Sequence, residues 1–167
     1  MDNSQRIDPP LVGSERELLT AFLDYHRQTL LWKIEGLNDT DLRRSMTPTG
    51  LSLLGLIKHL AYVERGWFQN EFAGEDVSFP WTDDDPDADF RIEPDETTEQ
   101  ILTLYKAEVE RSREITAAAS FDDIARGPRP RRKPSLRWII IHMIEETARH
   151  NGHVDLMREA IDGQTGE

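Results

Sequence analysis

Apolar residues recur at intervals of three and four along four long segments of the chain, which is the spacing of amphipathic helices. The first segment begins at a capping box, in which Ser14 and Glu17 can satisfy each other's backbone amides, and runs to about Leu37. The other three extend over about 52–72, 97–119 and 135–161. Nothing in the pattern favours a strand, so the sequence predicts an all-α protein.

The connections between these segments differ in length. Residues 38–50 are polar, and we expect one helical turn from Thr40 before a break at Pro48 and Gly50. Residues 74–96 form a long acidic connection, with apolar anchors at Phe79, Trp81, Phe90 and Ile92. A long crossover between the second and third helices predicts a four-helix bundle that fills one domain over residues 1–167, with 1–13 as a flexible arm. Such bundles place metals and cofactors between facing helices.

Composition excludes several classes of protein. The 167 residues include no cysteine, so disulfides, thiolate metal sites and cysteine nucleophiles are absent. The net charge of −12 opposes nucleic-acid binding, because phosphate contacts need a cationic surface. No apolar stretch approaches the roughly 20 residues of a membrane-spanning helix, and the polar N-terminus lacks the pattern of a secretory signal. We therefore expect a cytoplasmic protein without nucleic-acid or membrane partners.

The charge is unevenly distributed. Residues 71–100 hold twelve acids and one base, Arg91, whereas residues 124–144 hold six bases and no acid, all six within 126–137. The two segments either face each other or are separate solvated loops, and the second reading is the usual one for charge runs. The cluster from Asp83 to Asp89 lacks the order of ligands of a calcium loop, so we expect it to be solvated.

The last helix carries an unusual polar stripe. Three of the five histidines lie within residues 142–153, and residues three or four apart share a helical face. One stripe therefore contains His142, Glu146, His150 and His153. A metal ion explains polar residues on a face that should be core, and His59, in the apolar stripe of the second helix, is the expected donor from a second helix. Spacing alone leaves the pair on the last helix open: His142 with Glu146, Glu146 with His150, or His150 with His153.

Aromatic residues and the remaining candidate histidine have simpler interpretations. We expect Trp32, Trp67 and Trp138 to be core residues. Trp81, in the acidic connection, is a candidate for a lid over the site or for an oligomer contact. His26 is either a surface residue or a residue at the mouth of the site.

Three stretches of the chain resemble a known superfamily. They are GLIKHLAYVERGWF (residues 55–68), HMIEETARHNGH (142–153) and LMREAIDG (156–163). They look like the DinB-like superfamily of metalloproteins, and more closely its actinobacterial branch labelled mini-circle protein-like, over residues 18–163. The resemblance implies a four-helix bundle, a divalent cation, zinc or nickel, and a possible homodimer.

The resemblance also implies the ligands. Many members carry two histidines four apart on the last helix, the second followed by Arg-Gly-Gln. Here His150 takes the place of the second histidine, Glu146 stands four residues before it, and His153 takes the place of the glutamine. The related mycothiol-dependent maleylpyruvate isomerases use a His, Glu, His set, so the resemblance implies His59, Glu146 and His150 as metal ligands, with His153 as an orienting partner.

The function implied is a metal-dependent enzyme of the thiol S-transferase or isomerase class. The small-molecule thiol, of the mycothiol or bacillithiol type, must come from a cosubstrate because the chain has no cysteine. Candidate catalytic residues are His153, Glu145 and Arg149, and Arg149 or the 126–137 bases are candidates to hold a carboxylate. One alternative is a metal-dependent hydrolase, with Glu145 or His142 as proton shuttle. The other is a non-catalytic, stress-related binding protein stabilised by its metal.

Overall fold

The structure, a computed structural model, describes residues 6–128 and 133–165. Its elements in chain order are α1 (Glu15–Ile34), α2 (Asp39–Arg43), α3 (Leu53–Glu64), the π-helix η1 (Arg65–Ala73), α4 (Thr98–Ala118) and α5 (Leu136–Asp162). Within the described residues, the β-structure is limited to an isolated bridge between Ile124 and Ser135. The all-α prediction is confirmed.

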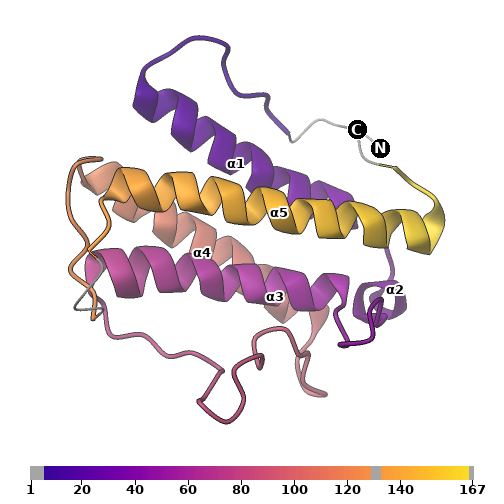
Figure 1. Cartoon of the computed structure of the whole chain (residues 1–167). Coiled ribbons are helices and arrows are strands. Elements are labelled where there is room, and N and C mark those ends of the chain that lie inside the picture. The colour runs from indigo at the N-terminus through magenta and orange to yellow at the C-terminus, as the bar shows by residue number, and fades with distance from the viewer. Residues whose placement is uncertain (1–5, 129–132, 166–167) are drawn as a thin grey trace.

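The long helices lie side by side in two pairs (Figure 1). Helix α1 packs along α5, while α3 packs along α4. Helices α3 and α5 are also neighbours, and they run in opposite directions (Figure 1). This antiparallel pairing matters for the site, because it brings the middle of α3 against the middle of α5.

Side chains cap the ends of these helices. At the start of α1, the hydroxyl of Ser14 accepts a hydrogen bond from the amide of Glu17, which forms the capping box that the sequence predicts. A guanidinium group caps the other end of α1. Arg158, on α5 and 3% exposed, donates to the carbonyls of Lys33 and Glu35 at the end of α1. Donors at a helix C-terminus satisfy carbonyls that have no partner within the helix. The caps therefore also fix α5 against α1.

The buried core divides into two clusters along the bundle. One lies around Leu30, Ile57 and Tyr105 and includes Val154 of α5. The other lies around Phe68 and Leu136 and reaches Met143 on α5. Between Met143 and Val154, the buried residues of α5 are polar: they are Thr147, His150 and Asn151. The interruption of the apolar core on α5 coincides with the polar stripe found in the sequence.

The predicted second helix departs from a regular α-helix in its second half. From Arg65 to Ala73 the backbone forms the wider turns of a π-helix and ends at Gly74, which has a φ of 72°. The amides of Arg126 and Gly127 donate to the carbonyls of Phe72 and Glu71. The start of the basic segment is thus bonded to the start of the acidic one. Arg129, Arg131 and Arg132, also in the basic segment, lie outside the described residues.

One residue expected in the core is not there. Trp138 is 45% exposed. Trp138 lies in the first turn of α5, at the end of the bundle, where fewer neighbours cover a side chain. Trp32 and Trp67 are partly buried.

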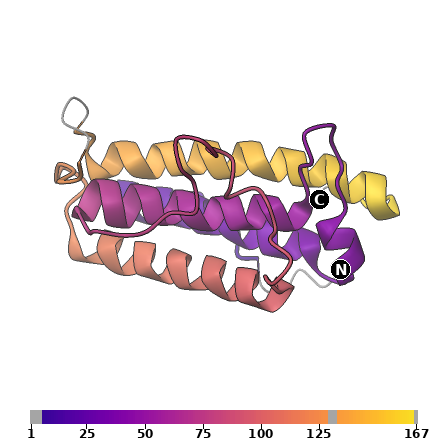
Figure 2. The same ribbon diagram turned by 90° about the horizontal axis from the view of Figure 1, so that it is seen from below.

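The acidic connection lies across the outer face of α3 (Figure 2). The ammonium group of Lys58, buried on α3, holds it there by donating to the carbonyl of Arg91 and to the carboxylate of Glu96, each at 2.7 Å. No helix within residues 6–128 and 133–165 combines the length and the apolarity needed to cross a bilayer.

Candidate metal centre

Three side chains from α3 and α5 converge in the middle of the bundle. His59, Glu146 and His150 each offer a ligand atom, and these atoms all lie within 4.8 Å of one another. Glu146 Oε1 is 3.2 Å from His150 Nε2 and 3.8 Å from His59 Nε2. Ligands at about 2.1 Å from a tetrahedral zinc ion stand about 3.4 Å apart. The three donors are thus near the spacing at which they would share one cation.

A carboxylate from the acidic connection fixes the orientation of His59. Nδ1 of His59 is 2.8 Å from Oδ2 of Asp89, which is 5% exposed. An ionised carboxylate only accepts hydrogen bonds, so Nδ1 carries the proton and donates it. The lone pair then lies on Nε2, the nitrogen that faces Glu146. A histidine bonded in this way to a carboxylate is a typical metal ligand.

The backbone of the connection approaches α3 closely to make this contact. A Cβ atom on Gly55 would lie 2.3 Å from the carbonyl oxygen of Phe90, so only glycine fits there. Gly55 precedes His59 by one helical turn and therefore lies on the same face. The ring of Phe90 stacks on the His59 imidazole at a centroid distance of 3.9 Å. Gly55 thus allows the connection to reach and cover the site.

The electrostatics of the cluster favour an ionised carboxylate. The neighbouring imidazoles of His150 and then His59 hold the pKa of Glu146 well below its ordinary value, although burial opposes this. Burial lowers the pKa of His59, but the nearby carboxylates of Asp89 and Glu146 outweigh the burial and raise it. The three donors are therefore one ionised carboxylate and two imidazoles, a set that suits a divalent cation.

The other histidines of α5 are placed differently. His142 does not reach the cluster of three donors; its ring lies 4.7 Å from that of Trp67 and 5.1 Å from that of Trp138. His153 is exposed, and its Nδ1 lies 3.4 Å from Nδ1 of His150. Of the three pairs that spacing allows, the structure brings Glu146 and His150 to His59, and it puts His153 beside the other nitrogen of His150.

The remaining candidate residues lie around this centre. Arg149 and Glu145 are exposed and paired with each other at 2.5 Å, and Arg149 also lies 3.5 Å from Glu146. Trp81 stacks on Phe79 and meets the edge of Tyr62, so it packs on the outside of α3. His26 is partly buried on α1, and its carbonyl accepts a bond from Asn151.

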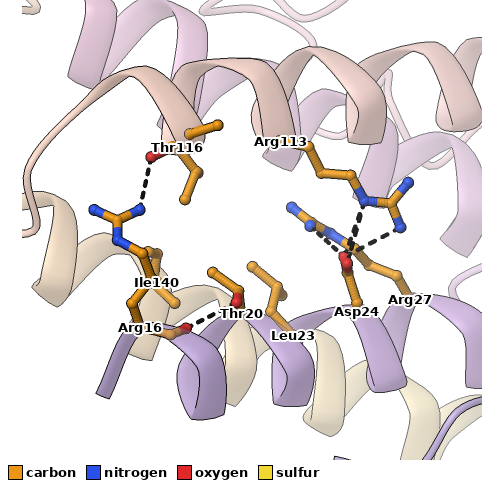
Figure 3. Close-up of a pocket in the computed structure, with 9 residues that line it drawn as sticks. Arg16, Thr20, Leu23, Asp24, Arg27, Arg113, Thr116 and Ile140 are labelled. Atoms are coloured by element: carbon orange, nitrogen blue, oxygen red, sulfur yellow. Dashed lines mark hydrogen bonds and ion pairs between the residues drawn. The ribbon is translucent and has the colours of Figure 1, made fainter. Parts of the chain in front are cut away.

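A cavity of about 260 Å³ between α1, α4 and α5 shares no lining residue with the metal centre (Figure 3). Asp24 lies between Arg27 and Arg113 and bonds to both (Figure 3). Arg16 donates to the carbonyls of Thr116 and Ala119. The charged groups of this cavity are thus bonded to one another or to backbone carbonyls at the end of a helix. Their role is to hold the helices together.

Comparison with known proteins identifies the family. The sequence model described as mycothiol-S-transferase matches residues 18–163. The chain belongs to the mycothiol-S-transferase family. This is a DinB-like family, so the resemblance seen in the sequence is confirmed. The part that matches the mycothiol-S-transferase family contains all of α1 to α5 except the first three residues of α1, and so includes the three donors. No curated protein matches the chain.

One residue of the site was missed in the sequence. Asp89 belongs to the acidic cluster expected to be solvated, and that expectation is wrong for this residue, which is buried against His59. Its one distinguishing signal is its position directly before Phe90, an apolar anchor. Gly55 carried a signal as well, since a glycine within a helix is unfavourable unless close packing requires it.

Proposed function

We propose that this protein is a metal-dependent thiol S-transferase that uses mycothiol as its thiol. The convergence of His59, Glu146 and His150 carries this proposal, because it gives a member of the mycothiol-S-transferase family a place to activate a thiol. The chain has no cysteine of its own, so the sulfur must enter with the cosubstrate.

The donor set fits a divalent cation. Two imidazoles and one carboxylate are the protein ligands of many catalytic zinc sites, which keep a further coordination position open. Zinc is our first choice on this ground, and nickel, which imidazole also binds well, is the second. A cation held by these three donors would supply positive charge that lowers the pKa of a thiol bound at the open position.

The residues of the chain have distinct roles in this proposal. Asp89 keeps the His59 proton on Nδ1, and Arg149 lies near the Glu146 carboxylate. His153, exposed and beside His150, is the group that we assign to accept the thiol proton. The sulfur then forms a bond to an electrophilic carbon of the acceptor, and the leaving group departs with the electron pair. For an acceptor that carries a carboxylate, Arg149 is the nearby cation.

The test is turnover with mycothiol and a panel of electrophilic acceptors, using zinc-loaded protein and the His150→Ala variant as control. Thioether formation by the wild type, and its loss in the variant, would support the proposal. Equal rates in both, or no product across the panel, would contradict it. Bacillithiol in place of mycothiol tests the specificity for the thiol.

Two further measurements distinguish the transferase from the hydrolase and from a protein whose metal is only structural. Cleavage of esters or amides without any thiol would identify a hydrolase instead. Absence of all turnover, together with a sharp fall in melting temperature on chelation, would identify a metal that only stabilises the bundle.

A further inference from the structure

One side of the helical bundle is not closed by direct packing of its helices. Helix α1 packs on α5, α5 on α3 and α3 on α4, whereas α1 and α4 do not pack closely along each other. Long side chains span the gap (Figure 3). Arg16 of α1 donates to the carbonyls of Thr116 and Ala119. Asp24 of α1 accepts from Arg113 of α4. The cavity of about 260 Å³ lies between these two crossings (Figure 3).

The lining of this cavity is positively charged, in contrast to the whole chain, whose net charge is −12. The charged groups of the lining are the guanidinium groups of Arg16, Arg27 and Arg113 and the carboxylate of Asp24. Arg27 is 4% exposed and also forms a bidentate pair with Glu64, which offsets a further positive charge. A positive charge is left over, so the cavity suits a small monovalent anion.

The arginines retain donors for such an anion. Arg16 makes one bond from each terminal nitrogen, and a guanidinium carries more N–H groups than these two bonds use. Nε of Arg113 lies 3.2 and 3.3 Å from the two oxygens of Asp24, and Nη1 lies 3.2 Å from the exposed Glu110. A tight charge-assisted bond measures about 2.7–2.9 Å. Its partners therefore hold Arg113 loosely, and its guanidinium can also bond to a ligand.

The rest of the lining is largely aliphatic. Leu23 of α1 and Ile140 of α5 are buried below the cavity, and Ala117 of α4 is exposed at its edge. Typical ligand pockets measure roughly 300–1,000 Å³, so a cavity of about 260 Å³ takes only a small molecule. A planar carboxylate matches the fork of a guanidinium, and a short hydrocarbon chain matches the aliphatic surface.

We infer that this cavity binds a small monocarboxylate with a short hydrocarbon body. The carboxylate accepts from the guanidinium of Arg113, and the hydrocarbon part packs against Leu23 and Ile140. Such a ligand closes the open side of the bundle, because it links α4 to α1. The cavity shares no residue with the metal centre, so this inference does not depend on the proposed function.

Calorimetric titration with 3-methylbutanoate tests this inference, at fixed ionic strength and in a buffer free of carboxylates. We expect the wild type to bind this acid and not 3-methylbutanamide, which has the same shape without the charge. Inorganic phosphate should bind at least about tenfold more weakly, because it lacks hydrocarbon to bury. No binding of 3-methylbutanoate would overturn the inference, as would equal affinity for the amide or for phosphate.

Two variants locate the bound acid. Arg113→Gln should weaken binding by about tenfold or more, because a hydrogen bond to a charged group is lost. The matched control is Arg111→Gln, on the same helix but outside the lining, with a side chain 44% exposed against 40% for Arg113. Ala117→Leu fills the edge of the cavity without removing a charge and should also weaken binding. Ala118→Leu, exposed and outside the lining, should not. Wild-type affinity in Arg113→Gln or Ala117→Leu would overturn the inference, as would equal losses in the two controls.

A further variant separates this cavity from the metal centre, because metal ions also bind carboxylates. His150→Ala removes one of the three donors, and we expect it to bind 3-methylbutanoate as the wild type does. Loss of binding in His150→Ala would place the acid at the metal centre and overturn the inference. Binding that needs Arg113 in a protein that takes up no metal would retain the carboxylate site and refute only the metal centre.

Discussion

Oδ2 of Asp89 lies 2.8 Å from Nδ1 of His59, although the two residues are thirty positions apart in the chain. His59 belongs to a regular helix, whereas Asp89 belongs to the long acidic connection. The connection is thus part of the candidate metal centre, because it sets which nitrogen of His59 faces Glu146.

Removing the Asp89 carboxylate should weaken metal binding without abolishing it. In Asp89→Ala, His59 loses the partner that holds its proton on Nδ1, and we expect zinc affinity to fall by about 10- to 100-fold. Competition with a chromophoric chelator measures the affinity. Asp84→Ala, an exposed residue of the same connection, is the control and should bind as the wild type does. Wild-type affinity in Asp89→Ala would refute the orienting role.

Gly55→Ala should disturb the site through the backbone of the connection. The new Cβ atom would lie 2.3 Å from the Phe90 carbonyl, so the segment that carries Asp89 must move. We expect a loss of about 1–3 kcal/mol in the free energy of unfolding and weaker zinc binding. Gly152→Ala is the matched control on α5, because no neighbouring atom lies within 4 Å of its Cβ position. In Gly152→Ala the free energy of unfolding should rise by about 0.5–1 kcal/mol. Equal effects of the two substitutions would contradict the close approach.

The buried pair of Arg27 and Glu64 should matter for stability. Two nitrogens of Arg27 donate to both oxygens of Glu64 at 2.7 and 2.6 Å, and the side chains are 5% and 2% exposed. Glu64→Gln removes the negative charge that faces the buried guanidinium of Arg27. We therefore expect the free energy of unfolding, measured by urea denaturation, to fall by about 3 kcal/mol. Glu93→Gln, which breaks an exposed pair with Arg91, should cost less than about 1 kcal/mol. A small effect of Glu64→Gln would show that water reaches the pair.

His26 should make stability depend on pH. Burial lowers its pKa below the ordinary value of 6.5, so between the two pKa values the unfolded chain binds a proton that the folded chain does not. Its stabilising contribution is therefore present above pH 6.5 and is lost as the pH falls toward the folded pKa. The free energy of unfolding should fall less steeply with decreasing pH in His26→Gln than in the wild type. If the free energy of unfolding depended on pH equally in the two proteins, the lowered pKa of His26 would be contradicted.

The helices and the polar stripe were predictable because each depends on local spacing. Ser14 with Glu17 marks the start of α1, and the interval of four between Glu146 and His150 places both side chains on one helical face. His59 was found because a histidine within an apolar stripe is unusual. These signals lie within single helices, where the period of the helix relates sequence to space.

The features that were missed depend on contacts between distant segments. Asp89 lies in an irregular connection, where no period predicts which of several aspartates turns inward. The π-helix is hidden for a similar reason, since its residues fit an ordinary helical pattern and its carbonyls bond to Arg126 and Gly127, far along the chain. Trp138 was placed in the core by its helical face, yet its position in the first turn of α5 leaves it exposed.

The most direct test of the account is the metal content of the purified protein, measured by elemental analysis on wild type, His59→Ala, Glu146→Ala and His150→Ala. His142→Ala is the control, because that histidine lies on the same face of α5 but outside the three donors. We expect about one zinc or nickel ion per chain in the wild type and the control, and almost none in the other three variants. A wild type without bound metal after loading, or variants that retain it, would contradict the metal centre.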